Sequence, residues 1–264
     1  MPTLKHIDNG KKFDWGNTSE DYAKYRDIYP QEFYEKILSL GLCTKGQRVL
    51  DLGTGTGVLP RNMYQCGAHF TGADIAENQI AAAKRLSEGM DIDYIVSAAE
   101  DISYPDGYFD TVTAVQCFMY FDKDKVLPVI HRILKDGGHF AILFMAYTDC
   151  EITYQSDELI LKYNPDWNGA HYKPNKNRDL SAATAPDWCG GLFKKADWIE
   201  YEVPVKFTRE TWHGRMKACR GMGASSLSME DKAAWEKEHL EFLNTMPETF
   251  TIPHWVTILN LEKI

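Results

Sequence analysis

The sequence predicts an α/β fold in which a mostly parallel sheet carries helices on both of its faces. The first observation is a regular alternation of short apolar runs and helix-forming segments between Arg48 and Tyr147. The second is a glycine-rich turn, Gly53-Thr54-Gly55-Thr56-Gly57, which directly follows the first apolar run. Strands that alternate with helices in this way need crossover connections, and such connections make neighbouring strands parallel.

Five strands are expected before Thr148, because each of five segments is a short apolar run. They cover residues 49–52, 69–75, 92–97, 109–117 and 138–147. Helices are expected between them over 57–66, 77–88 and 123–134. The glycine pair Gly137-Gly138 is typical of a helix C-cap and predicts where the last of these helices ends.

The flanking parts of the chain carry weaker but readable signals. Residues 20–41 favour helix with a break at Tyr29, because a residue before proline leaves the α region. Residues 163–191 are dense in Asn, Pro, Gly and Trp, which predicts an irregular lid or insertion. Beyond the lid we expect a strand over 198–207, near a sheet edge because of Pro204, and a helix over 209–222. A second helix is expected from the N-cap Ser228 to about residue 246, and a last strand over 250–261 is expected to break at Pro253.

Seven strands are therefore expected, five before the lid and two after it. The chain divides into four segments: an N-terminal helical cover, a core, a lid or insertion, and a C-terminal part that completes the sheet. Their bounds are 1–45, 46–150, 151–196 and 197–264.

Composition excludes several classes of protein. The 264 residues are 44% hydrophobic, enough for a full core, and the formal net charge of -9 argues against a nucleic-acid partner. The 6 cysteines and 8 histidines form no Cys-x-x-Cys or His-x-x-x-His pair, so no metal is expected and the thiols should pack as small core side chains. The polar first 30 residues and the lack of a long apolar run predict a soluble cytoplasmic protein without a membrane span.

The glycine turn and the acid that follows it predict a nucleoside site. Glycines let the backbone pass close to a ligand, since no Cβ intervenes. Asp74 stands at the end of the next predicted strand, where an acid can bind both hydroxyls of a ribose.

The spacing of the turn decides which nucleoside fits best. A dinucleotide fingerprint needs its third glycine at position 58, where this chain has Val58. Asp51 precedes the turn, and its charge would repel a pyrophosphate but attract a cation. A phosphate-binding loop is excluded because no Gly-Lys-Ser or Gly-Lys-Thr follows the glycines. A ribose, a base and a cation together describe S-adenosylmethionine.

Several motifs then follow in order and resemble one family. VLDLGTGTG, GADIAENQI, Ser97–Asp101, FDTVTAVQCFMYF and LKDGGHFAI resemble successive motifs of class I S-adenosylmethionine-dependent methyltransferases. The resemblance is to the small-molecule enzymes of the ubiquinone/menaquinone and trans-aconitate types, with a domain like methyltransferase domain 11. It covers residues 46–147, and the N-terminal FDWGNTSEDYAKYRDIYP resembles the family's first helix.

The resemblance implies a Rossmann-like seven-stranded sheet with an antiparallel last strand, and the independent strand count agrees with it. It also implies a set of roles for the cofactor S-adenosylmethionine and its product S-adenosylhomocysteine. Asp51 would bind the methionine ammonium, and Asp74 would bind the ribose. The adenine would lie against Ile75, Ala99 and Glu100, with Asp101 as a second candidate for the adenine contact. Gly53 and Gly55 would give backbone access, Gly57 would ease helix–strand packing, and Gln116 would face the methionine part and the transferred methyl.

Further residues are candidates for the acceptor side. Tyr22, Tyr25 and Tyr29 are expected to share a helical face, and with Arg26 to close over the cofactor; core packing and a surface ion pair are the alternatives for them. Tyr25, Arg26 and Gln116 are the catalytic candidates, and no metal is expected. The remaining substrate candidates are Tyr120, Trp188 and Arg215, and a solvated helix charge is the alternative for Arg215.

The acceptor itself is expected to be a small molecule, bound in a pocket of the C-terminal segment. Enzymes that methylate nucleic-acid bases commonly carry an Asn-Pro-Pro-Tyr-like tetrad where this chain has Gln116-Cys117-Phe118-Met119. Two other functions stay open, a non-catalytic S-adenosylmethionine-binding protein and an NAD-dependent oxidoreductase. The sequence indicates neither the acceptor nor the oligomeric state.

Overall fold

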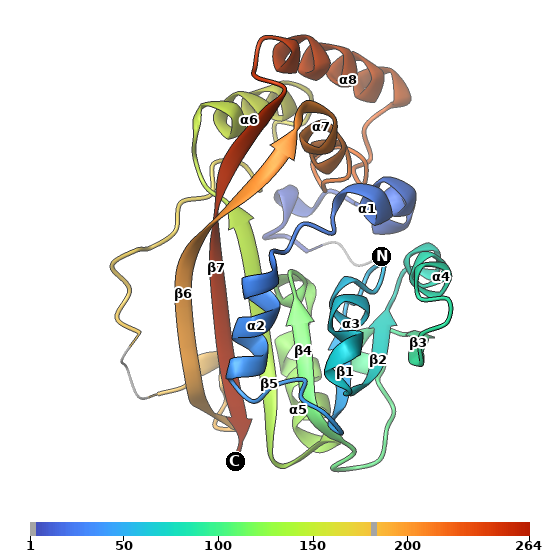
Figure 1. Cartoon of the computed structure of the whole chain (residues 1–264), viewed down its shortest axis with the longest axis vertical. Coiled ribbons are helices and arrows are strands. Elements are labelled where there is room, and N and C mark those ends of the chain that lie inside the picture. Colours follow the sequence, from blue (N-terminus) through green and yellow to red (C-terminus); the bar gives the residue numbers. More distant parts are fainter. Residues whose placement is uncertain (1–3, 181–183) are drawn as a thin grey trace. The chain divides into compact units, whose positions relative to one another are not determined.

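The central feature of the computed structural model, which describes residues 4–180 and 184–264, is a sheet of seven strands (Figure 1). Their order across the sheet is β3-β2-β1-β4-β5-β7-β6. The strands span Arg48–Leu52 (β1), His69–Asp74 (β2), Ile92–Val96 (β3), Phe109–Val115 (β4), Leu134–Tyr147 (β5), Phe193–Thr208 (β6) and Thr249–Lys263 (β7). The predicted fold class, mostly parallel with an antiparallel last strand, is confirmed.

The chain forms two compact units that interleave along the sequence. The sheet unit comprises Tyr29–Met145, Lys176–Tyr201 and Val256–Ile264. The helical unit comprises Met1–Ile28, Ala146–Asn175 and Glu202–Trp255. Strands β5, β6 and β7 contribute residues to both units. The contiguous four-segment division stays a prediction.

The helices of each unit follow the predicted alternation closely. The sheet unit contains α2 (Gln31–Ser39), α3 (Val58–Met63), α4 (Glu77–Leu86) and α5 (Lys123–Ile133). The helical unit contains α1 (Ser19–Tyr25), α6 (Glu151–Tyr163), α7 (Arg209–Lys217) and α8 (Met229–Asn244). Helix α6 lies inside the predicted insertion, and helix α7 ends five residues before the predicted bound at 222.

Sheet position explains the composition of the strands. Strand β1 pairs in parallel with β2 on one side and β4 on the other, so all but its first residue is buried. A strand with neighbours on both sides and covered faces needs an almost continuous apolar run. Strand β6 carries Pro204 and lies at the edge of the sheet, as expected for a residue that cannot donate to a ladder.

Several local predictions were wrong, and the expected break at Pro253 is one of them, since β7 runs unbroken from Thr249 to Lys263. The pair Gly137-Gly138 does not cap a helix, because α5 already ends at Ile133 and Leu134 pairs with Phe109 in the sheet. Gly137 has a φ of 70° and lies within β5, where the register with β4 shifts between Phe109 and Thr111. Burial of Leu134 decides the outcome, since extending the helix would remove this side chain from the core.

Another wrong prediction concerns the aromatic stripe near the N-terminus. Helix α1 ends at Tyr25 and α2 begins at Gln31, so Tyr29 lies in the extended connection and shares no helical face with Tyr22 and Tyr25. The break between the helices is wider than the one residue that Pro30 requires.

Among the helices of residues 4–180 and 184–264, none combines the length and the apolar composition that a membrane span requires.

Candidate functional site

The glycine turn at the carboxyl end of β1 has a conformation that favours glycine. Gly53, Gly55 and Gly57 have φ values of 60°, 56° and 74°, a region that other residues rarely adopt. The turn is also tightly packed. A Cβ on Gly53 would lie 2.7 Å from the Cβ of Cys117, and one on Gly57 would lie 2.9 Å from the Cζ of Tyr94. The turn therefore needs glycine for backbone conformation and for space.

Asp74 connects this turn to the next strand. The amide of Gly55 donates to its Oδ2 at 2.9 Å, and the amide of Ala76 donates to its Oδ1 at 2.9 Å. Burial raises the pKa of Asp74, and the amide donors oppose that shift. Each carboxylate oxygen keeps a second lone pair, so the group can still accept from two ligand hydroxyls.

Asp51 is a buried carboxylate two residues before the first glycine of the turn, with 2% of its surface exposed. The hydroxyl of Thr54 donates to its Oδ2 and the hydroxyl of Thr113 donates to its Oδ1, each at 2.7 Å. The pKa of Asp51 is raised to about 6, mainly by burial, with a smaller contribution from the charge of Asp74, while the two hydroxyl donors oppose the rise. Near neutral pH the group is therefore mostly an anion and favours a cationic ligand.

An exposed apolar side chain lies directly after Asp74. Ile75 is 53% exposed, although it follows a buried strand. Ala99 is buried in the short 3-10 turn Ala99–Asp101. Glu100 accepts the amide of Asp122 at 2.8 Å, so this carboxylate also supports the residue before α5. The exposed face of Ile75 is suited to an apolar ring.

Gln116 lies just after β4 in a strained conformation. Its φ is 64°, which is uncommon for a residue with a side chain and costs about 1 kcal/mol or more. Its amide donates to the carbonyl of Leu143 at 2.9 Å, and its side-chain Nε2 donates to the carbonyl of Met145. Strand β5 thus holds Gln116 in place. The thiol of Cys117 donates to the carbonyl of Leu52 at 3.0 Å and packs against Gly53.

Three acceptor candidates belong to the sheet unit, where each packs against neighbouring rings or the core. The ring of Tyr29 lies 4.7 Å from that of Phe33, and the ring of Trp188 lies 5.2 Å from that of Phe118. Tyr120 is half-buried against the main core cluster. These contacts fix the three side chains without assigning them a ligand.

The other acceptor candidates belong to the helical unit. Tyr25 donates to Glu210 at 3.1 Å, and its ring packs so closely on α7 that a Cβ on Gly214 would clash with it. The guanidinium of Arg26 lies 5.2 Å from the ring centroid of Tyr22. Tyr25 therefore has a packing role inside its own unit, whatever else it does.

Arg215 is buried rather than displayed on the helix surface. Only 4% of it is exposed, and its guanidinium lies 4.7 Å from the ring centroid of Tyr147 and 5.3 Å from that of Trp212. Cation–π contacts of this kind stabilise a buried guanidinium. Its burial excludes the alternative of a solvated helix charge.

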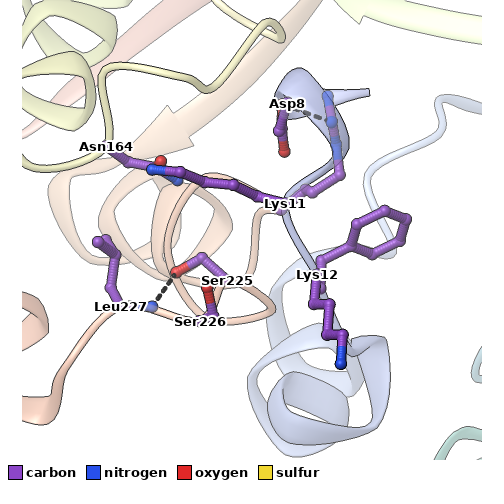
Figure 2. Close-up of a pocket in the computed structure, with 9 residues that line it drawn as sticks. Asp8, Lys11, Lys12, Asn164, Ser225, Ser226 and Leu227 are labelled. Carbon is purple, nitrogen blue, oxygen red and sulfur yellow. Dashed lines mark hydrogen bonds and ion pairs between the residues drawn. The ribbon is translucent and has the colours of Figure 1, made fainter. Parts of the chain in front are cut away.

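A small pocket of the helical unit was not expected from the sequence. Figure 2 shows the residues that line it: Asp8, Lys11, Lys12, Phe13, Asn164, Arg220, Ser225, Ser226 and Leu227. Within its surroundings Asp8 pairs with Arg220 at 2.6 Å, and Lys11 pairs with Asp166 at 2.6 Å. The carboxylate that lines this pocket, Asp8, is already paired with Arg220, which disfavours a role in binding a ribose or an ammonium.

Sequence reasoning missed Thr54, Thr113 and Cys117, which shape the turn and hold Asp51. The available signal was a pair of hydroxyl residues, Thr111 and Thr113, inside an apolar strand. Buried hydroxyls need hydrogen-bond partners, and a carboxylate on the neighbouring strand is one.

Residues 50–142 match the family model of the methyltransferase domain. The chain contains a methyltransferase domain. The predicted resemblance to class I S-adenosylmethionine-dependent methyltransferases is confirmed for this part of the chain.

Curated relatives share this methyltransferase domain. The chain is 35% identical over 113 residues to a demethylmenaquinone methyltransferase of Thermus thermophilus, covering 41% of this chain and 51% of that protein. It is 33% identical over 128 residues to a ubiquinone biosynthesis O-methyltransferase of Pseudomonas aeruginosa, covering 47% and 54%. The chain thus spans about half the length of the curated relatives it matches.

Solved structures share the fold at low sequence identity. A candidate type II methyltransferase from Anaeromyxobacter dehalogenans superposes with a TM-score of 0.58 at 17% identity, covering 89% of this chain and 96% of that one. The [4+2]-cyclase SpnF superposes with a TM-score of 0.52 at 17% identity, covering 88% and 80%. The methyltransferase domain therefore lies in a fold that also carries other chemistry.

Proposed function

We propose that the protein is an S-adenosylmethionine-dependent methyltransferase that acts on a small molecule. The observation that carries the proposal is the pair of carboxylates around the glycine turn. Asp74 is held by two backbone amides at the end of β2, and Asp51 is held by two hydroxyls at the end of β1. These groups match a ribose and an ammonium, respectively.

The residues around the turn fit the cofactor as a whole. Asp74 would accept the two ribose hydroxyls through its remaining lone pairs. Ile75, exposed beside it, would pack on the adenine, with Ala99 and Glu100 on the adenine's rim. Asp51 would attract the methionine ammonium directly or through a water, since so little of it is exposed. Gly53 and Gly55 keep the backbone side of the site free of Cβ atoms.

S-adenosylmethionine, when bound, supplies a methyl group already activated on a sulfonium. The protein's part is then to align donor and acceptor in line and to exclude water, with no acid–base group needed for an amine or a thiolate. Gln116, held by β5 after the end of β4, would border the methionine part. A hydroxyl or carbon acceptor would need a base, and Tyr25 and Arg26 stay the candidates for groups that close over the site.

The names of the relatives indicate which acceptors to test first. The relatives are named for demethylmenaquinone and ubiquinone biosynthesis, so phenols and quinols are the first acceptors to test. Tyr22, Tyr29, Tyr120, Trp188 and Arg215 remain candidates for acceptor contacts. The cytoplasmic location and the absence of a nucleic-acid partner stay predictions.

Calorimetric titration of the protein with S-adenosylmethionine, S-adenosylhomocysteine and NAD tests this function. We expect micromolar binding of the first two and none of NAD. Incubation with labelled methyl donor and a set of phenols, quinols, amines, acids and thiols then tests catalysis. Binding without any transfer would favour the non-catalytic alternative, and binding of NAD alone would favour the oxidoreductase.

A further inference from the structure

Asp51, Thr54 and Thr113 form a buried cluster that joins three segments of the sheet unit. Asp51 belongs to β1, Thr113 belongs to β4, and Thr54 belongs to the glycine turn. Each oxygen of the Asp51 carboxylate accepts one hydroxyl, Oδ2 from Thr54 and Oδ1 from Thr113, both at 2.7 Å. Two short bonds on opposite oxygens fix the plane of a carboxylate.

Contacts within the sheet fix the positions of both threonines. Thr113 lies directly opposite Asp51 in the parallel register of β1 and β4, and its side chain is fully buried. The amide of Thr54 donates to the carbonyl of Ala73 at 2.9 Å, which ties the turn to β2. On the β2 side, Gly72 lies opposite Asp51, and a Cβ there would lie 2.9 Å from the methyl carbon of Thr54. Thr54 therefore occupies space that only a glycine leaves open.

This arrangement leaves a defined part of the carboxylate for a ligand. A carboxylate oxygen has two lone pairs, and the hydroxyls use one on each oxygen. A hydroxyl that donates to a carboxylate also stabilises its ionised form against the cost of burial. The cluster thus keeps Asp51 charged and in one orientation.

We propose that Thr54 and Thr113 are positioning residues, which hold the Asp51 carboxylate for the ammonium end of the bound nucleoside. The proposal rests on the proposed function, because the ligand's ammonium is that of S-adenosylmethionine or its product. The two threonines act through Asp51 and touch neither the adenine nor the ribose. Their loss should therefore affect only ligands that carry the amino-acid part.

The test compares two probes that differ in that part. S-adenosylhomocysteine carries the ammonium, whereas 5′-deoxy-5′-methylthioadenosine keeps the adenine, ribose and thioether and lacks it. Calorimetric titration of Thr113→Val and Thr54→Val should show S-adenosylhomocysteine binding about tenfold or more weaker, since a bond to a charged group is lost. Binding of methylthioadenosine should change less than about twofold.

The chain offers a matched control on the same strand. Thr111 is also fully buried in β4, two residues before Thr113, but its hydroxyl lies 3.3 Å from the Oε1 of Gln47. Thr111→Val should leave the affinity for both probes unchanged. Thr113→Ser keeps the hydroxyl, so it should restore S-adenosylhomocysteine affinity to within about twofold of the parent.

Three results would overturn the assignment. Equal weakening of both probes in Thr113→Val would indicate a merely structural role, and unchanged binding of S-adenosylhomocysteine would indicate none. Failure of Thr113→Ser to restore affinity would show that the hydroxyl is not what matters. If instead the parent protein binds neither S-adenosylmethionine nor S-adenosylhomocysteine, the proposed function itself is wrong. Thermal melting of each variant identifies any that fails to fold.

Discussion

Binding of S-adenosylhomocysteine should weaken as the pH falls, because Asp51 must be ionised to attract the ammonium. The pKa of Asp51 is raised to about 6, mainly by burial. A change of pH from 7.5 to 5 therefore converts the carboxylate from mostly ionised to mostly protonated. If only the ionised form binds, the affinity at pH 5 should be about tenfold below its value at neutral pH. The loss should be half-complete near pH 6.

The groups around Asp51 set this midpoint. The charge of Asp74 raises the pKa of Asp51, and the hydroxyls of Thr54 and Thr113 lower it. Burial raises the pKa of the Cys117 and Cys43 thiols and of the Tyr94 hydroxyl, so these groups stay neutral over the same range. Burial also raises the pKa of Asp74, the carboxylate whose charge acts on Asp51, and Asp74 is the residue proposed to bind the ribose.

Calorimetry in two buffers of different ionisation enthalpy measures the effect directly. At pH 6 we expect about half a proton to be released per S-adenosylhomocysteine bound, and close to none at pH 7.5. Binding of methylthioadenosine is expected to depend on Asp74 but not on Asp51, so it provides the reference. The ratio of the two affinities then reports the effect of Asp51 ionisation alone. The variant Asp51→Asn should bind weakly and show a flat ratio.

Two outcomes would refute this reasoning. The affinity ratio could stay constant between pH 5 and 7.5, which would place the carboxylate's pKa outside this range or the ammonium elsewhere. Alternatively, Asp51→Asn could keep the same pH profile as the parent, which would assign the titration to another group.

Three further predictions concern single residues. Asp74→Ala should weaken binding of S-adenosylhomocysteine and methylthioadenosine equally, by about tenfold or more, since both carry the ribose; calorimetry that shows no loss would contradict the ribose role. Gly57→Ala should lower the free energy of unfolding in urea by roughly 1–3 kcal/mol, because of its positive φ and its contact with Tyr94; an unchanged urea midpoint would mean that the turn relaxes freely. His239 should make the protein less stable in acid, since burial lowers its pKa from 6.5 to about 3. The unfolded chain takes up this proton below pH 6.5 and the folded chain only near pH 3, so stability falls across that window by up to about 5 kcal/mol. Urea unfolding of the parent and of His239→Gln between pH 4 and 7 measures the contribution of this histidine. If the free energy of unfolding depended on pH in the same way in both proteins, the prediction would be contradicted.

Local sequence signals predicted the strand, turn and helix that form the candidate cofactor site. Strand β1, the turn and helix α3 follow one another within a few residues, and glycine at positive φ is a property of the turn itself. Asp51 and Asp74 could be identified because their roles depend on their position at a strand end. The antiparallel direction of the last strand was implied by family resemblance rather than by local pattern.

Partners distant in sequence lay outside the reach of such signals. The Gly137-Gly138 pair looks like a helix end, yet the burial of Leu134 against the sheet turns it into part of β5. Arg215 looks like a solvated helix charge, yet it is buried on the rings of Tyr147 and Trp212. In each case a tertiary contact outweighs the local preference, which is worth only a fraction of the burial energy.

The sequence by itself determined the glycine turn, the two acids beside it and the alternation that makes the sheet parallel, because these depend on backbone freedom and on periodicity. Only the tertiary structure decided how Asp51 is held, since Thr113 comes from another strand and meets it through register. It also decided that Tyr25 packs on α7 and that Tyr29 lies outside helix α1. Register and packing join residues far apart in the chain, and no local pattern encodes which ones will meet.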